Sequence, residues 1–210
     1  MRTLILVAAM AVNAAAATVS YDFAGEVWST WGADAIPVDD IVGITTGDLV
    51  VGSFTIDLDI VGQQDAQGNE FNLGYLDSVI DFDIVVGDLS FVHNLDDVRV
   101  VSITNNAVNH DRFGMTTFIT TDNIRAVARA TISDSTAQMF SDLSLDNAVN
   151  LPFGDDLRKL LSLDFIATEE RVNIDWQTLT MRSPVPEPSA IVLLIFGLLI
   201  CQCRNVLRLS

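Results

Sequence analysis

Hydrophobic and polar residues alternate along much of the middle of this chain. Between Phe54 and Ile60 every second residue is a large apolar one and the intervening residues are polar, and residues 80–86 repeat the scheme. Successive side chains of a strand point to opposite faces, so this alternation predicts half-buried β-strands. Five further segments are also strand candidates: 98–104, 115–121, 124–132, 160–165 and 172–179.

Turn residues separate these segments. Glycine, asparagine and aspartate gather between them, at 47–48, 62, 68–69 and 105–106. Many short antiparallel strands with one wet face predict an all-β domain over residues 18–182, an antiparallel β-sandwich of jelly-roll or lectin-like type. One segment differs: residues 147–161 are the best candidate for a helical turn, because Pro152 and the acidic pair 155–156 are typical of a helix start before residues 157–161.

The first 17 residues have the layout of a secretory signal peptide. Arg2 precedes an apolar core at residues 4–12, and small residues occupy 14–17. This pattern predicts removal of residues 1–17 by cleavage between Ala17 and Thr18. The chain is therefore expected to be exported by the general secretory route.

The C-terminal segment carries a second targeting pattern. Val185, Pro186, Glu187 and Pro188 lead into an apolar run at 190–201, and a short basic tail follows with Arg204 and Arg208. A helix over residues 189–210 would be about 30 Å long at 1.5 Å per residue, enough to cross a bilayer. Residues 183–188 are expected to be a stiff, extended linker, because prolines do not extend a sheet.

This tail resembles the PEP-CTERM sorting signal of Gram-negative bacteria that produce exopolysaccharide. The resemblance implies that a membrane-embedded cysteine protease, the exosortase, recognises Pro186, Glu187 and Pro188. It also implies a precursor held transiently in the inner membrane, then release to the periplasm, the cell surface or the extracellular matrix.

Charge narrows the possible partners. Setting aside the targeting segments removes three of the 11 basic residues and one of the 28 acidic residues, which leaves eight bases against 27 acids. Such a surface repels nucleic acid and favours cations and solubility. The eight bases are scattered along the sequence, so no phosphate-binding patch is expected and nucleic acid is excluded as a partner.

Two aspartate pairs are the only metal candidates. Asp57 with Asp59, and Asp81 with Asp83, place two carboxylates on one strand face each. Ca²⁺ binds such oxygen ligands, but neither pair lies in a calcium-binding loop motif. A solvated acidic face is therefore the preferred interpretation, with Ca²⁺ as the alternative and no other cofactor expected.

Catalytic motifs are not evident. His93 is expected on a strand and His110 on a turn, and neither has the local context of a nucleophilic triad. Glu26 and Glu170 are the carboxylate pair that a glycoside hydrolase would require, but nothing in the sequence marks them. No catalytic residue is assigned, and a polysaccharide-active hydrolase is the third function considered.

Tryptophans give the sharpest binding hypothesis. Trp28 and Trp31 follow Tyr21 and Phe23 in an aromatic opening, and either could contact a glycan or close the edge of the core. Trp176 is expected in the core of the last strand. The sequence thus predicts an exported, non-enzymatic cell-surface or exopolysaccharide-matrix protein processed by an exosortase. The alternative is a carbohydrate-binding, lectin-like module with an extracellular polysaccharide as partner.

Overall fold

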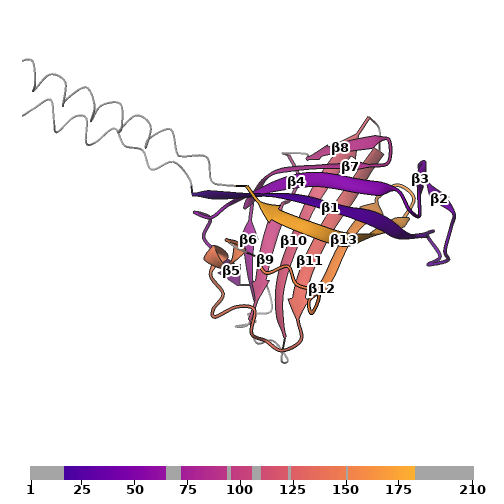
Figure 1. Ribbon diagram of the computed structural model, residues 1–210. Coiled ribbons are helices and arrows are strands. Elements are labelled where there is room, and N and C mark those ends of the chain that lie inside the picture. Colours follow the sequence, from indigo (N-terminus) through magenta and orange to yellow (C-terminus); the bar gives the residue numbers. More distant parts are fainter. Residues whose placement is uncertain are drawn as a thin grey trace, which may run out of the picture. The chain divides into compact units, whose positions relative to one another are not determined.

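The computed structural model describes residues 17–64, 72–93, 96–105, 110–122, 124–149 and 151–182. The regular secondary structure of these residues consists of β-strands and one short 3₁₀ helix, η1 (Leu145–Ala148) (Figure 1). The strands are β1 (Thr18–Trp31), β2 (Asp40–Ile41), β3 (Ile44–Thr45), β4 (Leu49–Asp57), β5 (Gln63–Gln64), β6 (Asn72–Leu76), β7 (Val79–Val86), β8 (Leu89–His93), β9 (Val100–Thr104), β10 (Asp111–Thr121), β11 (Ile124–Asp134), β12 (Arg158–Phe165) and β13 (Arg171–Met181).

Both targeting segments lie almost entirely outside this description. Of the predicted signal peptide only Ala17 is described, and β1 begins at the next residue, Thr18. The sorting motif at 185–188, the apolar run and the basic tail all fall within 183–210, outside the described residues. Within the described part of the chain, no helix is long and apolar enough to cross a membrane.

Eight of the described strands form a closed, hydrogen-bonded ring in the order β11, β12, β13, β1, β4, β7, β8 and β10. All neighbours in the ring are antiparallel, and β10 pairs with β11 along its whole length. The other side of β10 is shared, because Ile119 and Thr120 pair with β8 whereas residues 112–116 pair with β9. β9, β6 and β5 form a branch beside the ring. Figure 1 shows β4, β1 and β13 running across β9, β10 and β11.

The prediction of an all-β antiparallel domain is confirmed, and the prediction of a sandwich is wrong. Both architectures give the same alternation along each strand, so the alternation does not distinguish them. Closure depends on curvature, and β1 is curved by register shifts after Ala24 and after Val27. Gly25 lies at the first shift, where an added Cβ would come within 2.3 Å of the Asp175 carbonyl oxygen, so β1 and β13 approach this closely only at a glycine.

The predicted buried faces hold in β4 and in β7 from Phe82 onward, and only the start of β7 is shifted by one residue. Phe54 and Ile56 are buried, as the alternation predicts. In β7, Val79 rather than Ile80 occupies the buried position, because the pairing with β4 slips between Thr55 and Ile56. A bulge of this kind adds one residue to a strand and turns the side chains before it to the other face.

The helix predicted to begin just before residues 157–161 is wrong: of the described residues in the 147–161 segment, only Asn147 and Ala148 are helical, as the end of η1. Residues from Arg158 onward form β12, which is hydrogen-bonded to β11 on one side and to β13 on the other. Two flanking strands satisfy the backbone groups of this segment, and a helix of so few residues has little intrinsic stability. The 3₁₀ helix η1 lies earlier, with the Ser144 hydroxyl accepting a hydrogen bond from the Asp146 N–H.

Aromatic side chains fill the interior of the ring beside β1, β4 and β13. Tyr21 stacks on Phe54 with ring centroids 5.2 Å apart, and Phe23 meets Trp176 edge to face at 5.9 Å. Phe54 lies 6.5 Å from Trp176. Trp176 is buried, which confirms its predicted place in the core of the last strand. These contacts bind the first, fourth and last strands into one core.

The connection between β11 and β12 is fastened to this core by both tyrosines of the chain. The buried Tyr21 hydroxyl donates to the Ala148 carbonyl at 2.8 Å and accepts from the Leu151 N–H at 3.0 Å. Tyr75 donates to the Leu143 carbonyl, and burial raises the pKa of its phenol, so the proton it donates is retained. The connection therefore packs against the core through polar as well as apolar contacts.

Replacing Tyr21→Phe is expected to lower the free energy of unfolding by about 1–3 kcal/mol, because the Ala148 carbonyl and the Leu151 N–H lose a buried partner. Urea denaturation measures the change. Thr178→Ala, at an exposed position of β13, is the control and is expected to stay within about 0.5 kcal/mol of the original protein. Equal stabilities for Tyr21→Phe and the control would show that the connection does not depend on this hydroxyl.

Candidate functional site

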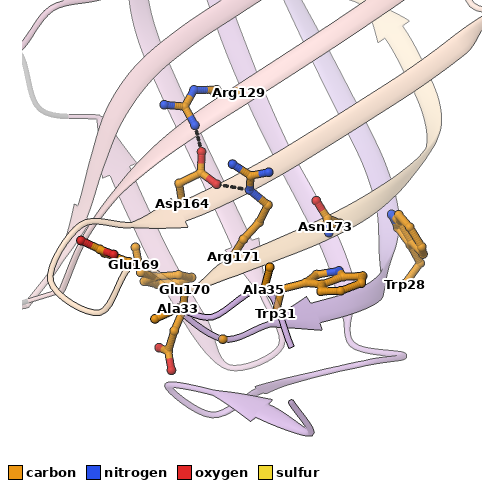
Figure 2. Close-up of a pocket in the computed structure, with 12 residues that line it drawn as sticks. Trp28, Trp31, Ala33, Ala35, Arg129, Asp164, Glu169, Glu170, Arg171 and Asn173 are labelled. Carbon is orange, nitrogen blue, oxygen red and sulfur yellow. Dashed lines mark hydrogen bonds and ion pairs between the residues drawn. The ribbon is translucent and has the colours of Figure 1, made fainter. Parts of the chain in front are cut away.

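A cleft of about 580 Å³ lies on the outside of the ring, where the end of β1 meets β12 and the start of β13 (Figure 2). Its walls come from β1 and the loop that follows it, from the end of β12, from the β12–β13 turn and from Arg129 of β11. The lining residues are Trp28, Trp31, Gly32, Ala33, Ala35, Arg129, Asp164, Phe165, Glu169, Glu170, Arg171 and Asn173.

The structure brings the two predicted glycan-contact residues, Trp28 and Trp31, into this one cleft. Residues three apart in a regular strand point to opposite faces, but the register shift between Val27 and Ser29 removes that difference. Trp28 is 54% exposed and does not close the edge of the core, whereas Trp31 is half-buried and that alternative stays open for it.

Hydrogen bonds hold the polar edge of this aromatic wall. The Ser29 hydroxyl accepts from the Trp31 Nε1–H at 3.0 Å and from the Asn173 side-chain amide at 3.0 Å. The indole nitrogen of Trp31 is therefore used within the protein, which fixes the ring at the cleft. Figure 2 shows Trp28, Trp31 and Asn173 toward one side of the cleft, with Glu169 and Glu170 toward the other.

Two arginines share one carboxylate above the tryptophans. Asp164 of β12 forms ion pairs with Arg129 of β11 and with Arg171 of β13 (Figure 2). The Asp164 side chain is 19% exposed, whereas the arginine side chains are 48% and 54% exposed. Each guanidinium has five N–H donors, so donors remain that face the cleft. The three side chains orient one another and present hydrogen-bonding groups to a ligand.

The β12–β13 turn adds two further carboxylates to the rim. It is closed by hydrogen bonds from the Phe165 N–H to the Glu170 carbonyl at 2.8 Å and from the Glu169 N–H to the Phe165 carbonyl at 3.0 Å. Glu170 lines the cleft, but Glu26 does not, because it lies on β1 opposite Leu49 and Asp175. The structure does not place Glu26 and Glu170 together in this cleft.

Two of the four aspartates considered for Ca²⁺ accept hydrogen bonds within the protein. Asp57 accepts a hydrogen bond from the Asp59 N–H at 2.9 Å, and Asp83 accepts one from the Ser53 hydroxyl at 2.7 Å. Asp81 is exposed on the outside of β7. Within the described ranges, no group of three or more histidine, cysteine, aspartate or glutamate side chains could hold a metal ion. Calcium binding stays a prediction without structural support.

The histidines lie apart from the cleft lining. His93 ends β8, as expected of a strand residue, and burial followed by the nearby Arg99 lowers the pKa of its imidazole. His110 precedes β10 and lines a different hollow together with Arg112 and Arg158.

Bases that are far apart in the sequence lie on neighbouring strands in the structure. Five of the eight between Thr18 and Arg182 are exposed on the strands β10 to β13. Two of them could be placed from the sequence, because Arg125 and Arg129 are four residues apart in one strand and therefore share its outer face. The others could not, because the sequence does not reveal which strands are neighbours. The five are Arg112, Arg125, Arg129, Arg158 and Arg171.

The described unit is thus a closed antiparallel barrel with a surface cleft of tryptophan, asparagine and ion-paired arginine. No family model matches the chain, and no curated protein or solved structure matches it.

Replacing Asp164→Asn is expected to lower the free energy of unfolding by about 1 kcal/mol at low salt, because two neighbouring guanidiniums lose their shared counter-charge. Denaturation at low and high salt measures this loss, which is expected to disappear at high ionic strength. Asp175→Asn is the matched control, since Asp175 is exposed and forms no ion pair within the described residues. Indistinguishable stabilities of the two variants at low salt would contradict the network.

Proposed function

We propose that this chain is an exported, non-enzymatic protein of the cell surface or exopolysaccharide matrix, and that its barrel binds carbohydrate in the Trp28/Trp31 cleft. One observation carries the binding proposal: two indoles line the same cleft as an amide and an arginine–aspartate network. Ligand sites combine apolar surface with a few polar groups fixed in direction, and this cleft has that combination.

The chemistry of a sugar ring fits such a lining. One face of a pyranose carries C–H groups, which pack on an aromatic ring, and its edge carries hydroxyls, which both donate and accept hydrogen bonds. The exposed Trp28 supplies the apolar surface. Asn173 and Arg171 supply donors, and Glu170 supplies acceptors, at the same cleft.

Export and surface location rest on the two ends of the chain. The N-terminal pattern that ends at Ala17 favours secretion, and the Pro186–Glu187–Pro188 motif before an apolar run favours exosortase sorting. The excess of acids over bases favours a soluble, strongly hydrated surface, which suits a protein that works among polysaccharides.

Trp28→Ala is expected to weaken binding to the preferred glycan about tenfold, which corresponds to about 1.4 kcal/mol of lost aromatic contact. Screening the protein against a polysaccharide panel and titrating the best ligand measures the effect, and Trp31→Ala is expected to act in the same direction. Leu49→Ala is the control, because Leu49 is 73% exposed on β4 and does not line the cleft. Unchanged affinity in both tryptophan variants would exclude this cleft as the binding site.

Exosortase processing is expected to give a mature protein that begins near Thr18 and ends between Pro186 and Ser189. Intact-mass measurement of the protein recovered from cells with and without an active exosortase tests this. The shortened C-terminus should be lost when the exosortase is inactive. A product that keeps Cys201 and the residues after it in both backgrounds would exclude exosortase processing.

A further inference from the structure

A second hollow, of about 770 Å³, lies on the outer face of β10, β11 and β12. Two arginines, three hydroxyl residues and a histidine account for most of its lining, and no tryptophan takes part. These residues are Arg112, Arg158, Thr131, Ser133, Ser135 and His110. The lining is therefore rich in hydrogen-bond donors, as an anion site requires.

Strand register sets the two arginines side by side. Arg112 of β10 and Arg158 of β12 are both paired with Ser133 of β11, so they lie on the same face with one strand between them. Two strand spacings separate their backbones by roughly 10 Å. Long guanidinium side chains can reach a common ligand across that distance.

These two arginines lack the counter-charge that the others have. Within the described residues, the other five arginines, at 99, 125, 129, 171 and 182, each form an ion pair with an aspartate. Arg112 donates only to the Thr131 hydroxyl, at 3.2 Å, among the contacts described. Asp156 also lines the hollow, but among the described residues it forms no ion pair with either arginine. Two adjacent guanidiniums with no ion-paired carboxylate, in a chain with so many acids, favour an external anion.

A third hollow, of about 400 Å³, joins this anion site to the tryptophan cleft. It shares Trp28 with the cleft, and it shares Arg158 and Leu160 with the second hollow. Because neighbouring hollows share lining residues, we treat the three as one groove. It follows the curved outer surface over β1, β13, β12, β11 and β10, four strand spacings or roughly 19 Å along that surface. A chain molecule can therefore contact both Trp28 and the arginine pair.

We propose that this groove binds an acidic polysaccharide, with a sugar ring on Trp28 and the carboxylate of a uronic acid residue on Arg112 and Arg158. The proposal rests on the carbohydrate-binding function proposed for the cleft and names its ligand class. Arginine suits the carboxylate, because the planar guanidinium donates two parallel hydrogen bonds to it.

The lining favours a polyuronate over a nucleic acid. The three hollows hold as many acidic as basic residues, five of each, so the groove has no excess of positive charge with which to follow a phosphate backbone. A polyuronate also offers C–H ring faces, which suit Trp28, beside carboxylates, which suit the arginine pair.

Calorimetric titration of the full chain with oligogalacturonate, and with the same oligomer after carboxyl reduction, tests the proposal. The acidic oligomer is expected to bind about tenfold more tightly, the size of a charge-assisted hydrogen bond. The double substitution Arg112→Gln with Arg158→Gln is expected to abolish this preference, so that the two oligomers bind with equal affinity. Arg125→Gln is the matched control, since Arg125 is exposed on β11 but lines none of the three hollows.

The outcomes separate this proposal from the proposed function. Equal affinities for the two oligomers would overturn the anion site, and so would a preference that survives the double substitution. In either case, weaker binding of the reduced oligomer to the Trp28→Ala variant would still support carbohydrate binding in the cleft. Binding of oligogalacturonate that needs the arginines but not Trp28 would overturn the shared groove and the proposed function of the cleft together. No binding of oligogalacturonate, or tighter binding of single-stranded DNA, would overturn the proposal as well. Unchanged thermal unfolding of each variant shows that a loss of binding is not a loss of fold.

Discussion

The antiparallel pairing of β1 with β13 is the contact on which the rest of the structure depends. It joins the first described strand to the last and closes the ring, so neither strand is left with an unpaired edge. The same pairing brings Trp31 opposite Arg171 and Ser29 opposite Asn173, which assembles the polar and aromatic walls of the cleft. Without this closure, the residues of the cleft would belong to opposite ends of the sequence and of the sheet.

The pairing of β1 with β13 also places the cleft at one end of these two strands and residues Thr18 and Arg182 at the other. The Arg182 N–H donates to the Ser20 carbonyl at 2.9 Å, so the start of β1 and the end of β13 are adjacent. The cleft is built from the opposite ends of the same two strands, and a strand the length of β1, 14 residues, spans roughly 45 Å. A ligand in the cleft therefore lies far from the point where the chain continues beyond Arg182.

Strand pairing decides which arginines of this acidic protein have an aspartate nearby. Acids dominate the composition, and most arginines are balanced by an aspartate close by, as in the bidentate contact of Arg182 with Asp22. That contact lowers the pKa of the Asp22 carboxyl, so its contribution to stability is present above the carboxyl's unfolded pKa and is lost as the pH falls through its lowered, folded pKa. Arg112 and Arg158 stand out against this pattern, because the register places them together while the groove carboxylate of Asp164 pairs with two other arginines. The net charge of the chain therefore does not predict the local charge at this surface.

The sequence by itself determined the all-β class and the burial of Phe54 and Trp176, because a strand of period two buries one face wherever it lies. It could not determine closure, since the same alternation serves a sandwich and a barrel, and it misplaced Ile80 because a bulge leaves no mark in the alternation. It suggested Trp28 and Trp31 but not the side chains beside them. Their partners come from strands 100 or more residues away, and only the pairing of β1 with β13 and of β12 with its neighbours decides which charges meet them.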